Sequence, residues 1–394
     1  MKRCCITLAA LVILALVLNA GCRKKEEEGL EIGPSKPGPY KVGALFAVTG
    51  PASWLGDPEK KTVEMIVDQI NKAGGINGHS LRVIVEDTGA KEADAVSAIK
   101  KLIDSDRVCA VIGPSTSGES LAVLNVAQEK GVPLISCAAA ATIVQPADQK
   151  KWVFKVPQMD SDCVRRIYDY MKEKGWTKVA LITTTTGFGA AGKKQLEDLS
   201  KEYGIEIVAN ETYKPTDTDM TVQLTKIKNS GAQALVNWSI EEGQSTVLTN
   251  AKQLELNMQL FQSHGFGNLK YVELARGAAE GVIFPAGPLL APEGLPDNHP
   301  QKKVLLEYKK AYEAKYKDRV STFGGHAYDA LYLVIEALKA VGPNKVEMRD
   351  FIENKKGFVG TAGVFNFSPQ DHCGLDKTAF VMYTVKGGKF VPLQ

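Results

Sequence analysis

The chain has little net charge. Its 394 residues include 48 Lys and Arg against 45 Asp and Glu, which gives a formal net charge of +3. A basic surface for nucleic acid would have to be local, because binding a polyanion depends on concentrated positive charge. We therefore expect no nucleic-acid partner. The hydrophobic share of 44% and the charged share of 24% are ordinary for a globular protein, and the length suggests about two domains.

Cysteine and histidine are also scarce. Seven cysteines in this length cannot form a disulfide scaffold, and the sequence leaves open whether Cys137 and Cys163 approach each other. The five histidines are scattered, with no HExxH motif and no Cys/His cluster of zinc-ligand spacing, so we expect no metal. The serines of Gly113–Gly118 do not have the GxSxG spacing of a nucleophile turn, and we expect no enzyme.

The only long apolar run, Ile6–Leu18, is too short to span a bilayer, which takes roughly 20 residues. Lys2 and Arg3 precede it, as in a signal peptide, which we assign to residues 1–21. Removing this segment would lower the formal net charge from +3 to +1.

Small residues precede the third cysteine of the chain. Ala20-Gly21-Cys22 resembles a bacterial lipobox, whose cysteine becomes lipidated and begins the mature chain. A plain secretory signal is the alternative. Residues 22–39 are charged and then rich in Gly and Pro, which predicts a flexible tether.

One glycine motif, Gly187-Phe-Gly-Ala-Ala-Gly192, formally matches a dinucleotide site. It follows the strand-like run Val179–Thr184 and opens a helix. However, it lies outside the first strand–helix–strand unit, and an exported protein meets few nicotinamide cofactors. We interpret these glycines as a tight strand-to-helix turn and expect no cofactor.

From Tyr40 onward, strand-like runs alternate with helical stretches. We expect strands at Lys41–Val48, Leu81–Glu86, Val108–Ile112, Val132–Ser136, Val153–Val156, Val179–Thr184, Ile205–Ala209, Ala234–Trp238 and Leu260–Ser263. We expect helices at Pro58–Ala73, Glu92–Ile103, Asp160–Lys174, Lys302–Tyr316 and Ala327–Val341, and a terminal hairpin around Gly387-Gly388. The alternation predicts an α/β fold with parallel sheets in two lobes.

The segment Gly113–Ser120 can serve a ligand or a helix. A strand leads into a Ser/Thr/Gly loop and then a helix N-terminus, where free N–H groups and the helix dipole favour an anion. The hydroxyls of Ser115 and Ser117 add donors, so a small carboxylate is a natural ligand. Alternatively, Ser117 caps the helix and needs no ligand. This segment alone leaves both uses open.

Four motifs, taken in order, carry a family resemblance. They are Val48-Thr-Gly-Pro-Ala52, Ile70-Asn-Lys-Ala-Gly-Gly-Ile-Asn-Gly78, Val111-Ile-Gly-Pro-Ser-Thr-Ser-Gly118 and Gly131-Val-Pro-Leu-Ile-Ser136. Together with the lipobox, they resemble the branched-chain (hydrophobic) amino acid-binding family, the periplasmic receptors of ABC importers.

The resemblance, from Tyr40 to the C-terminus, implies a type I periplasmic binding fold. Two Rossmann-like lobes, joined by three crossover strands, would close on a small ligand. Lobe 1 would comprise residues 40–156 and 286–366, and lobe 2 residues 157–285 and 367–394.

The resemblance also implies which residues bind the ligand. The family serine that holds the ligand carboxylate falls on Ser117, with Ser115 beside it. Other family positions fall on or beside Trp54, Leu55, Ala138, Ala140, Phe188, Trp238, Ser239, His264 and Phe266. Trp238 and His264 have simple packing roles as alternatives.

Three departures from the family pattern concern the ligand's ammonium group. The family's threonine and tyrosine fall on Ala140 and Phe188, and its acidic residue falls in Ser263–Phe266, which has no carboxylate. An unpartnered buried ammonium is costly, so the pattern predicts a hydrophobic or aromatic acid of the benzoate type. Alternatively, Glu241 or Glu242 supplies the charge and the ligand is an aliphatic branched-chain amino acid.

The segments Gln262-Ser-His-Gly265 and Ser321-Thr-Phe-Gly-Gly-His-Ala-Tyr-Asp329 also look like those of members that bind benzoate-type compounds. The resemblance implies a partner ABC permease, a monomer, and a place in the periplasm or cell envelope, anchored through Cys22. A ligand sensor for a signalling receptor is a further alternative.

Overall fold

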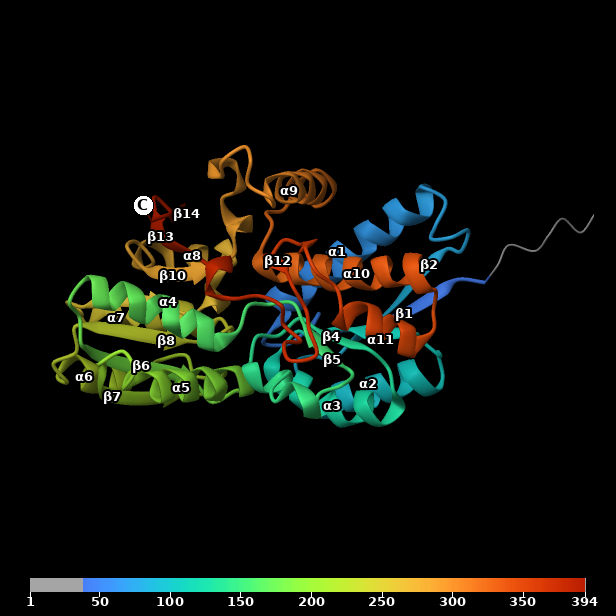
Figure 1. Ribbon diagram of the computed structural model, residues 1–394. Coiled ribbons are helices and arrows are strands. Elements are labelled where there is room, and N and C mark those ends of the chain that lie inside the picture. The colour runs from blue at the N-terminus through green and yellow to red at the C-terminus, as the bar shows by residue number, and fades with distance from the viewer. Residues whose placement is uncertain (1–37, 394) are drawn as a thin grey trace, which may run out of the picture. The chain divides into compact units, whose positions relative to one another are not determined.

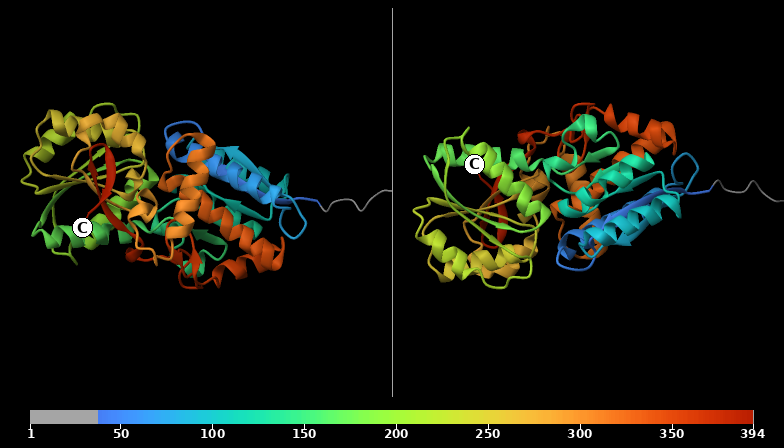
Figure 2. Two further views of the ribbon diagram at one scale, coloured as in Figure 1. Left: turned by 90° about the horizontal axis from the view of Figure 1, so that it is seen from above. Right: turned by 90° about the horizontal axis from the view of Figure 1, so that it is seen from below.

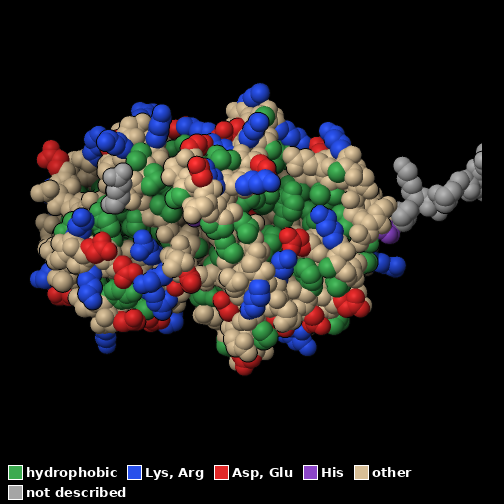
Figure 3. Space-filling model, turned by 45° about the horizontal axis from the view of Figure 1, so that its top comes forward, with side chains coloured by type: hydrophobic (Ala, Val, Ile, Leu, Met, Phe, Trp, Pro, Cys, Tyr) green, Lys and Arg blue, Asp and Glu red, His purple; other side chains and the backbone are tan. Residues whose placement is uncertain are grey.

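The computed structural model describes residues 38–393. The predicted signal peptide, the lipidation of Cys22 and nearly all of the tether lie outside these residues. Within them, no helix combines the length and the apolar character that a membrane crossing needs. Charged side chains of both signs are mixed over the face shown in Figure 3.

The first lobe is built on a five-stranded parallel sheet (Figure 1). Its strands are β1 (Tyr40–Phe46), β2 (Leu81–Asp87), β3 (Ala110–Ile112), β4 (Leu134–Ser136) and β5 (Val153–Lys155), in the order β2-β1-β3-β4-β5. Its helices are α1 (Ser53–Lys72), α2 (Glu92–Asp104), α3 (Ser117–Lys130), α9 (Lys302–Tyr316), α10 (Thr322–Val341) and α11 (Lys345–Glu353). Strands β3, β4 and β5 are buried throughout, as expected for a parallel sheet that helices cover on both faces.

The second lobe has a mixed seven-stranded sheet. Its strands are β6 (Lys178–Thr184), β7 (Glu206–Tyr213), β8 (Ala234–Trp238), β9 (Gln259–Gln262), β10 (Ile283–Ala286), β13 (Val381–Lys386) and β14 (Lys389–Pro392), in the order β14-β13-β10-β9-β8-β6-β7. Its helices are α4 (Asp160–Glu173), α5 (Gly187–Ser200), α6 (Thr221–Lys228), α7 (Gly243–Gln253) and α8 (Leu269–Ala275). The hairpin β13–β14 confirms the predicted terminal element and pairs antiparallel with β10, so this sheet is not wholly parallel.

The chain passes between the lobes three times (Figures 1 and 2). The first passage joins β5 to α4, the second joins β10 to α9, and the third joins β12 (Val364–Phe365) to β13. Strand β12 itself pairs with β11 (Phe358–Val359) in a small antiparallel ladder. The third passage differs from the predicted division at residue 367, because Phe367, Cys373 and Leu375 still pack in the core of the first lobe.

Two helices begin earlier than predicted. Helix α1 starts at Ser53 rather than Pro58, and α10 starts at Thr322 rather than Ala327. In α10, the hydroxyl of Ser321 accepts the N–H of Gly324 and caps the helix. Two adjacent glycines hid this first turn, because glycine is a weak helix former.

Candidate functional site

The candidate site lies where strand order reverses in both sheets. In the first sheet β1 lies between β2 and β3, and in the second β6 lies between β7 and β8. Ligands of open α/β sheets bind beyond the carboxyl ends of strands at such a reversal. The loops after β3, β4, β8 and β9 meet there around one cavity.

This cavity is small and is lined by residues of both lobes. Its volume is about 20 Å³, room for about one water molecule. It is lined by Leu55, Ser115, Ser117, Cys137, Ala138, Ala139, Pro157, Phe188, Ile240, His264, Gly265, Phe323 and His326. Two hydrogen bonds join the lobes: the Asn268 amide donates to the Trp54 carbonyl at 3.1 Å, and Thr322 N–H donates to the Gly267 carbonyl at 3.1 Å.

Ser117 does not cap α3, the alternative role that its sequence position allowed. The cap of α3 is Thr116, whose hydroxyl accepts the N–H of Glu119 at 3.3 Å. Ser117 is the first helical residue, and its buried hydroxyl accepts the N–H of Ala140 at 3.3 Å. Its hydrogen therefore remains available to the cavity that it lines.

Ser115 lines the same cavity from the loop between β3 and α3. Its hydroxyl accepts the N–H of Ala47 at 3.0 Å and shares a short hydrogen bond with the buried carboxyl of Glu59. Ser115 and Ser117 thus place two hydroxyls beside the N-terminus of α3. This end of the cavity suits an anion.

Two histidines line the cavity, His264 from the loop after β9 and His326 from α10. Burial and the charge of Lys155 lower both pKa values, that of His264 well below its usual range and that of His326 to about 3. Both rings are therefore neutral near pH 7. Neither ring nitrogen of His264, nor Nδ1 of His326, has a hydrogen-bond partner among residues 38–393. A neutral imidazole offers one donor and one acceptor, so the pair can bind a polar group of a ligand.

The three glycines of the GxGxxG motif serve close packing. A Cβ at Gly187 would lie 2.8 Å from Cα of Gly118, at the N-terminus of α3 in the other lobe. A Cβ at Gly192 would lie 2.1 Å from the ring of Trp238. None of the three has a positive φ, so direct contact rather than a left-handed turn accounts for them.

The structure brings together six of the eleven residues predicted for the ligand site. Leu55, Ser115, Ser117, Ala138, Phe188 and His264 line the cavity. Trp54, Ala140, Trp238, Ser239 and Phe266 lie outside its lining.

Each of the other five is engaged elsewhere. Trp54 packs on Tyr271, with ring centroids 5.2 Å apart, and Phe266 stacks on the same tyrosine at 5.8 Å. Trp238 lies behind the cavity wall, where its ring packs on Phe188 at 5.6 Å and on His264 at 5.7 Å. The N–H of Ala140 donates to Ser117, and the hydroxyl of Ser239 donates to Glu241.

Sequence reasoning missed the lining residues Cys137, Ala139, Pro157, Ile240, Gly265, Phe323 and His326. His326 and Phe323 lie within the segment from Ser321 to Asp329 that the sequence had already singled out, so a signal for them existed. Cys137 is a free thiol, as is Cys163 in the core of the second lobe. Cys137 and Cys163, whose proximity the sequence left open, therefore form no disulfide in this structure.

Glu241, the alternative ammonium partner, lines a neighbouring cavity of about 90 Å³. Its Oε2 accepts the hydroxyl of Ser239 at 2.7 Å and the N–H of Ile240 at 3.3 Å. Among residues 38–393, no Asp or Glu lines the smaller cavity. Ile240 and Phe188 separate the two spaces, because both residues line each of them.

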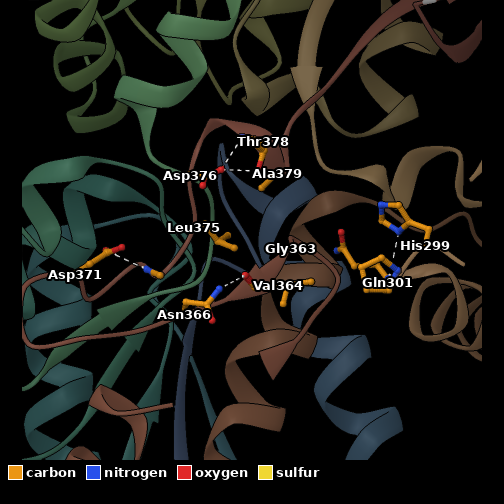
Figure 4. A pocket seen from close by; sticks show the side chains of 12 residues that line it. His299, Gln301, Gly363, Val364, Asn366, Asp371, Leu375, Asp376, Thr378 and Ala379 are labelled. Atoms are coloured by element: carbon orange, nitrogen blue, oxygen red, sulfur yellow. Dashed lines mark hydrogen bonds between the residues drawn. The ribbon is translucent and has the colours of Figure 1, made fainter. Parts of the chain in front are cut away.

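A larger hollow of about 460 Å³ lies beside the third passage between the lobes (Figure 4). Its polar side chains are engaged locally. Asp371 accepts the N–H groups of Cys373 and Gly374, Asp376 accepts the N–H of Thr378, and His299 accepts the N–H of Gln301. Within residues 38–393, the buried histidine nitrogens that lack partners belong to His264 and His326, which line the smaller cavity.

The chain is similar to known proteins in sequence and in structure. The family described as "Periplasmic binding protein" matches residues 39–389. The leucine-, isoleucine-, valine-, threonine- and alanine-binding protein of Pseudomonas aeruginosa is 24% identical over 310 residues, 78% of this chain and 80% of that protein.

Two solved structures are also similar. An extracellular ligand-binding receptor from Rhodopseudomonas palustris has a TM-score of 0.85 and 26% identity, covering 90% of this chain and 99% of that one. The branched-chain amino acid transporter substrate-binding protein LivJ of Streptococcus pneumoniae, in complex with isoleucine, has a TM-score of 0.78 and 28% identity, covering 90% of this chain and 100% of that one. The predicted α/β type I fold is thereby confirmed, and the chain belongs to the periplasmic binding protein family.

Proposed function

We propose that the protein is the solute receptor of an ABC importer and closes its lobes on a small hydrophobic carboxylate of the benzoate type. The observation that carries this proposal is the make-up of the cavity. It combines two hydroxyls at a helix N-terminus with apolar walls, and among residues 38–393 no carboxylate lines it. An ammonium group buried there would lack an anionic partner, and that is costly.

The ligand carboxylate binds at Ser115 and Ser117, where the dipole of α3 favours negative charge. The hydrophobic part of the ligand packs on Leu55, Phe188 and Phe323. His264 and His326 supply neutral polar contacts, for example to a ring hydroxyl or to the carboxylate itself. The cavity is too small for such a ligand, so binding requires the lobes to part and then close around it.

The transport role rests on the family and on the names of its relatives. We propose a permease as the partner, a location in the periplasm or cell envelope, a lipid anchor at Cys22 and a monomeric state. The residues proposed for the tether, 22–39, would leave both lobes free to move above the membrane.

An aliphatic branched-chain amino acid is the second candidate ligand. It is favoured by the isoleucine that the Streptococcus pneumoniae relative holds and by the closeness of Glu241 to the cavity wall. A shift of Ile240 would join the two cavities and expose an ammonium group to that carboxylate.

A thermal-shift screen of the purified mature domain separates the two ligands. The screen compares benzoate and hydroxybenzoates with leucine, isoleucine and valine. A bound ligand at 100 times its Kd raises the free energy of unfolding by about 2.7 kcal/mol. Stabilisation by the benzoates supports the proposal. Stabilisation by leucine, isoleucine or valine alone shows that the ligand keeps its amine and refutes it.

A further inference from the structure

Ser115 has a buried acid directly behind it. Glu59, on α1, is fully buried and does not line the cavity, but its Oε2 shares a hydrogen bond with the Ser115 hydroxyl. Its other oxygen, Oε1, has no hydrogen-bond partner within the described part of the chain. The Ser115 hydroxyl also accepts the N–H of Ala47 at 3.0 Å.

The number of hydrogens around Ser115 decides what this hydroxyl can offer a ligand. A serine hydroxyl has one hydrogen and two lone pairs, and Ala47 occupies one lone pair. An ionised Glu59 can only accept, so it would take the hydrogen of Ser115 and leave none for a ligand. A protonated Glu59 can donate to the second lone pair, and the hydrogen of Ser115 is then free to point into the cavity.

The surroundings favour the protonated form. Burial raises the pKa of Glu59 well above its usual range, a hydrogen bond that Ser115 can donate to the ionised form lowers it, and the nearby Glu119 of α3 raises it. The Cys137 thiol, just after β4, also lies near Glu59, and its own pKa is raised by burial and by Glu59. A negative charge at Glu59 would also repel a carboxylate bound to Ser115.

We propose that Glu59 is a positioning residue for the ligand: as a neutral acid it donates to Ser115 and thereby aims the Ser115 hydroxyl at the ligand carboxylate. This inference rests on the proposed carboxylate ligand. Through Ser115, a neutral Glu59 would let the site select an anion without a cation in the cavity.

Substitution of Glu59 by glutamine gives a decisive result in either direction. The Gln amide keeps the shape, is neutral at every pH and can donate an N–H to Ser115 as a protonated Glu59 does, so Glu59→Gln should bind benzoate within about twofold of the native affinity. If Glu59 were ionised in the native protein, the same variant would free the Ser115 hydrogen and bind about tenfold more tightly, which would overturn the proposal. Ser115→Ala should weaken binding about 10–150-fold, the range for a hydrogen bond to a charged group. Native-like affinity in Ser115→Ala would also overturn it.

The pH profile tests the role of the proton. Benzoic acids ionise near pH 4, as other carboxyls do, so the charge of the probe is constant from about pH 6 to 9. Over this range Glu59→Gln should bind with constant affinity, whereas the native affinity should fall only above the pH at which Glu59 ionises. A parallel fall in both proteins would contradict the proposal.

Controls separate this inference from the proposed function. Glu64→Gln makes the same change at an exposed position of α1 and should leave affinity and pH profile unchanged. Calorimetric titrations with benzoate and with leucine use the same variants. If only leucine binds, the proposal of a ligand without an amine is wrong. The role of Glu59 can still be tested, because the affinity of the same variants for leucine reports on its carboxylate.

Discussion

Ser117 and Thr116 are neighbours at the N-terminus of α3, yet their replacement by alanine should affect different properties. Thr116 caps the helix, and its hydroxyl also donates to Glu119 at 2.6 Å. Losing a cap of this kind costs about 0.5–2 kcal/mol of stability. Ser117 contributes one long bond from Ala140, worth about 1 kcal/mol, and a hydroxyl that faces the cavity.

The two variants should therefore be similarly destabilised but differ in affinity. Ser117→Ala removes a hydrogen bond to the ligand carboxylate and should cost about 1.5–3 kcal/mol of binding free energy, a rise in Kd of about 10–150-fold. Thr116→Ala should leave Kd within about threefold, because the Thr116 side chain lies outside the lining of the site cavity.

Denaturant unfolding and calorimetric titration of both variants measure these effects. The comparison holds the stability loss roughly constant, so an effect on affinity can be assigned to the hydroxyl. If Thr116→Ala weakens binding as much as Ser117→Ala, order in the first helical turn matters rather than the hydroxyl. If neither weakens binding, the ligand carboxylate is not held at α3.

Substitutions at Gly187, Glu241 and His326 should each have a distinct effect. Gly187→Ala places a methyl against Gly118 of the other lobe and should favour the open state. Overpacking of about 1–3 kcal/mol would raise Kd about 5–150-fold. Gly294→Ala, with open space around it, should leave Kd unchanged in the same titration. Glu241→Gln should leave benzoate affinity unchanged, and a loss of leucine binding in this variant would favour the amino-acid ligand. Burial and Lys155 lower the pKa of His326 to about 3, below its unfolded value of about 6.5, so its contribution to stability is present above pH 6.5 and is lost as pH falls. Between pH 6.5 and pH 5 the free energy of unfolding should therefore fall by about 1.6 kcal/mol more in the native protein than in His326→Asn.

Sequence alone determined the local elements and hence the fold class. Strands such as Ala234–Trp238 and helices such as Lys302–Tyr316 have the predicted bounds, because an apolar run or a helical period is a property of consecutive residues. The residues of the turn after β3 also indicated that it could bind an anion or cap a helix, but not which of the two. The missed first turn of α10 shows the limit, since its glycines are needed where distant segments leave no room for a Cβ.

Tertiary structure decided which of these residues share a cavity. In a helix each residue turns the side chain by about 100°, so a cap at Thr116 instead of Ser117 redirects both hydroxyls. Trp238 ends β8, His264 follows the adjacent β9, and their rings pack together, yet only His264 lines the cavity. His326 and Glu59 belong to helices far apart in the sequence and reach the site only because the first lobe packs α1 and α10 together. Sequence fixes which groups are available, but burial and the partners met across space decide which remain free to bind a ligand.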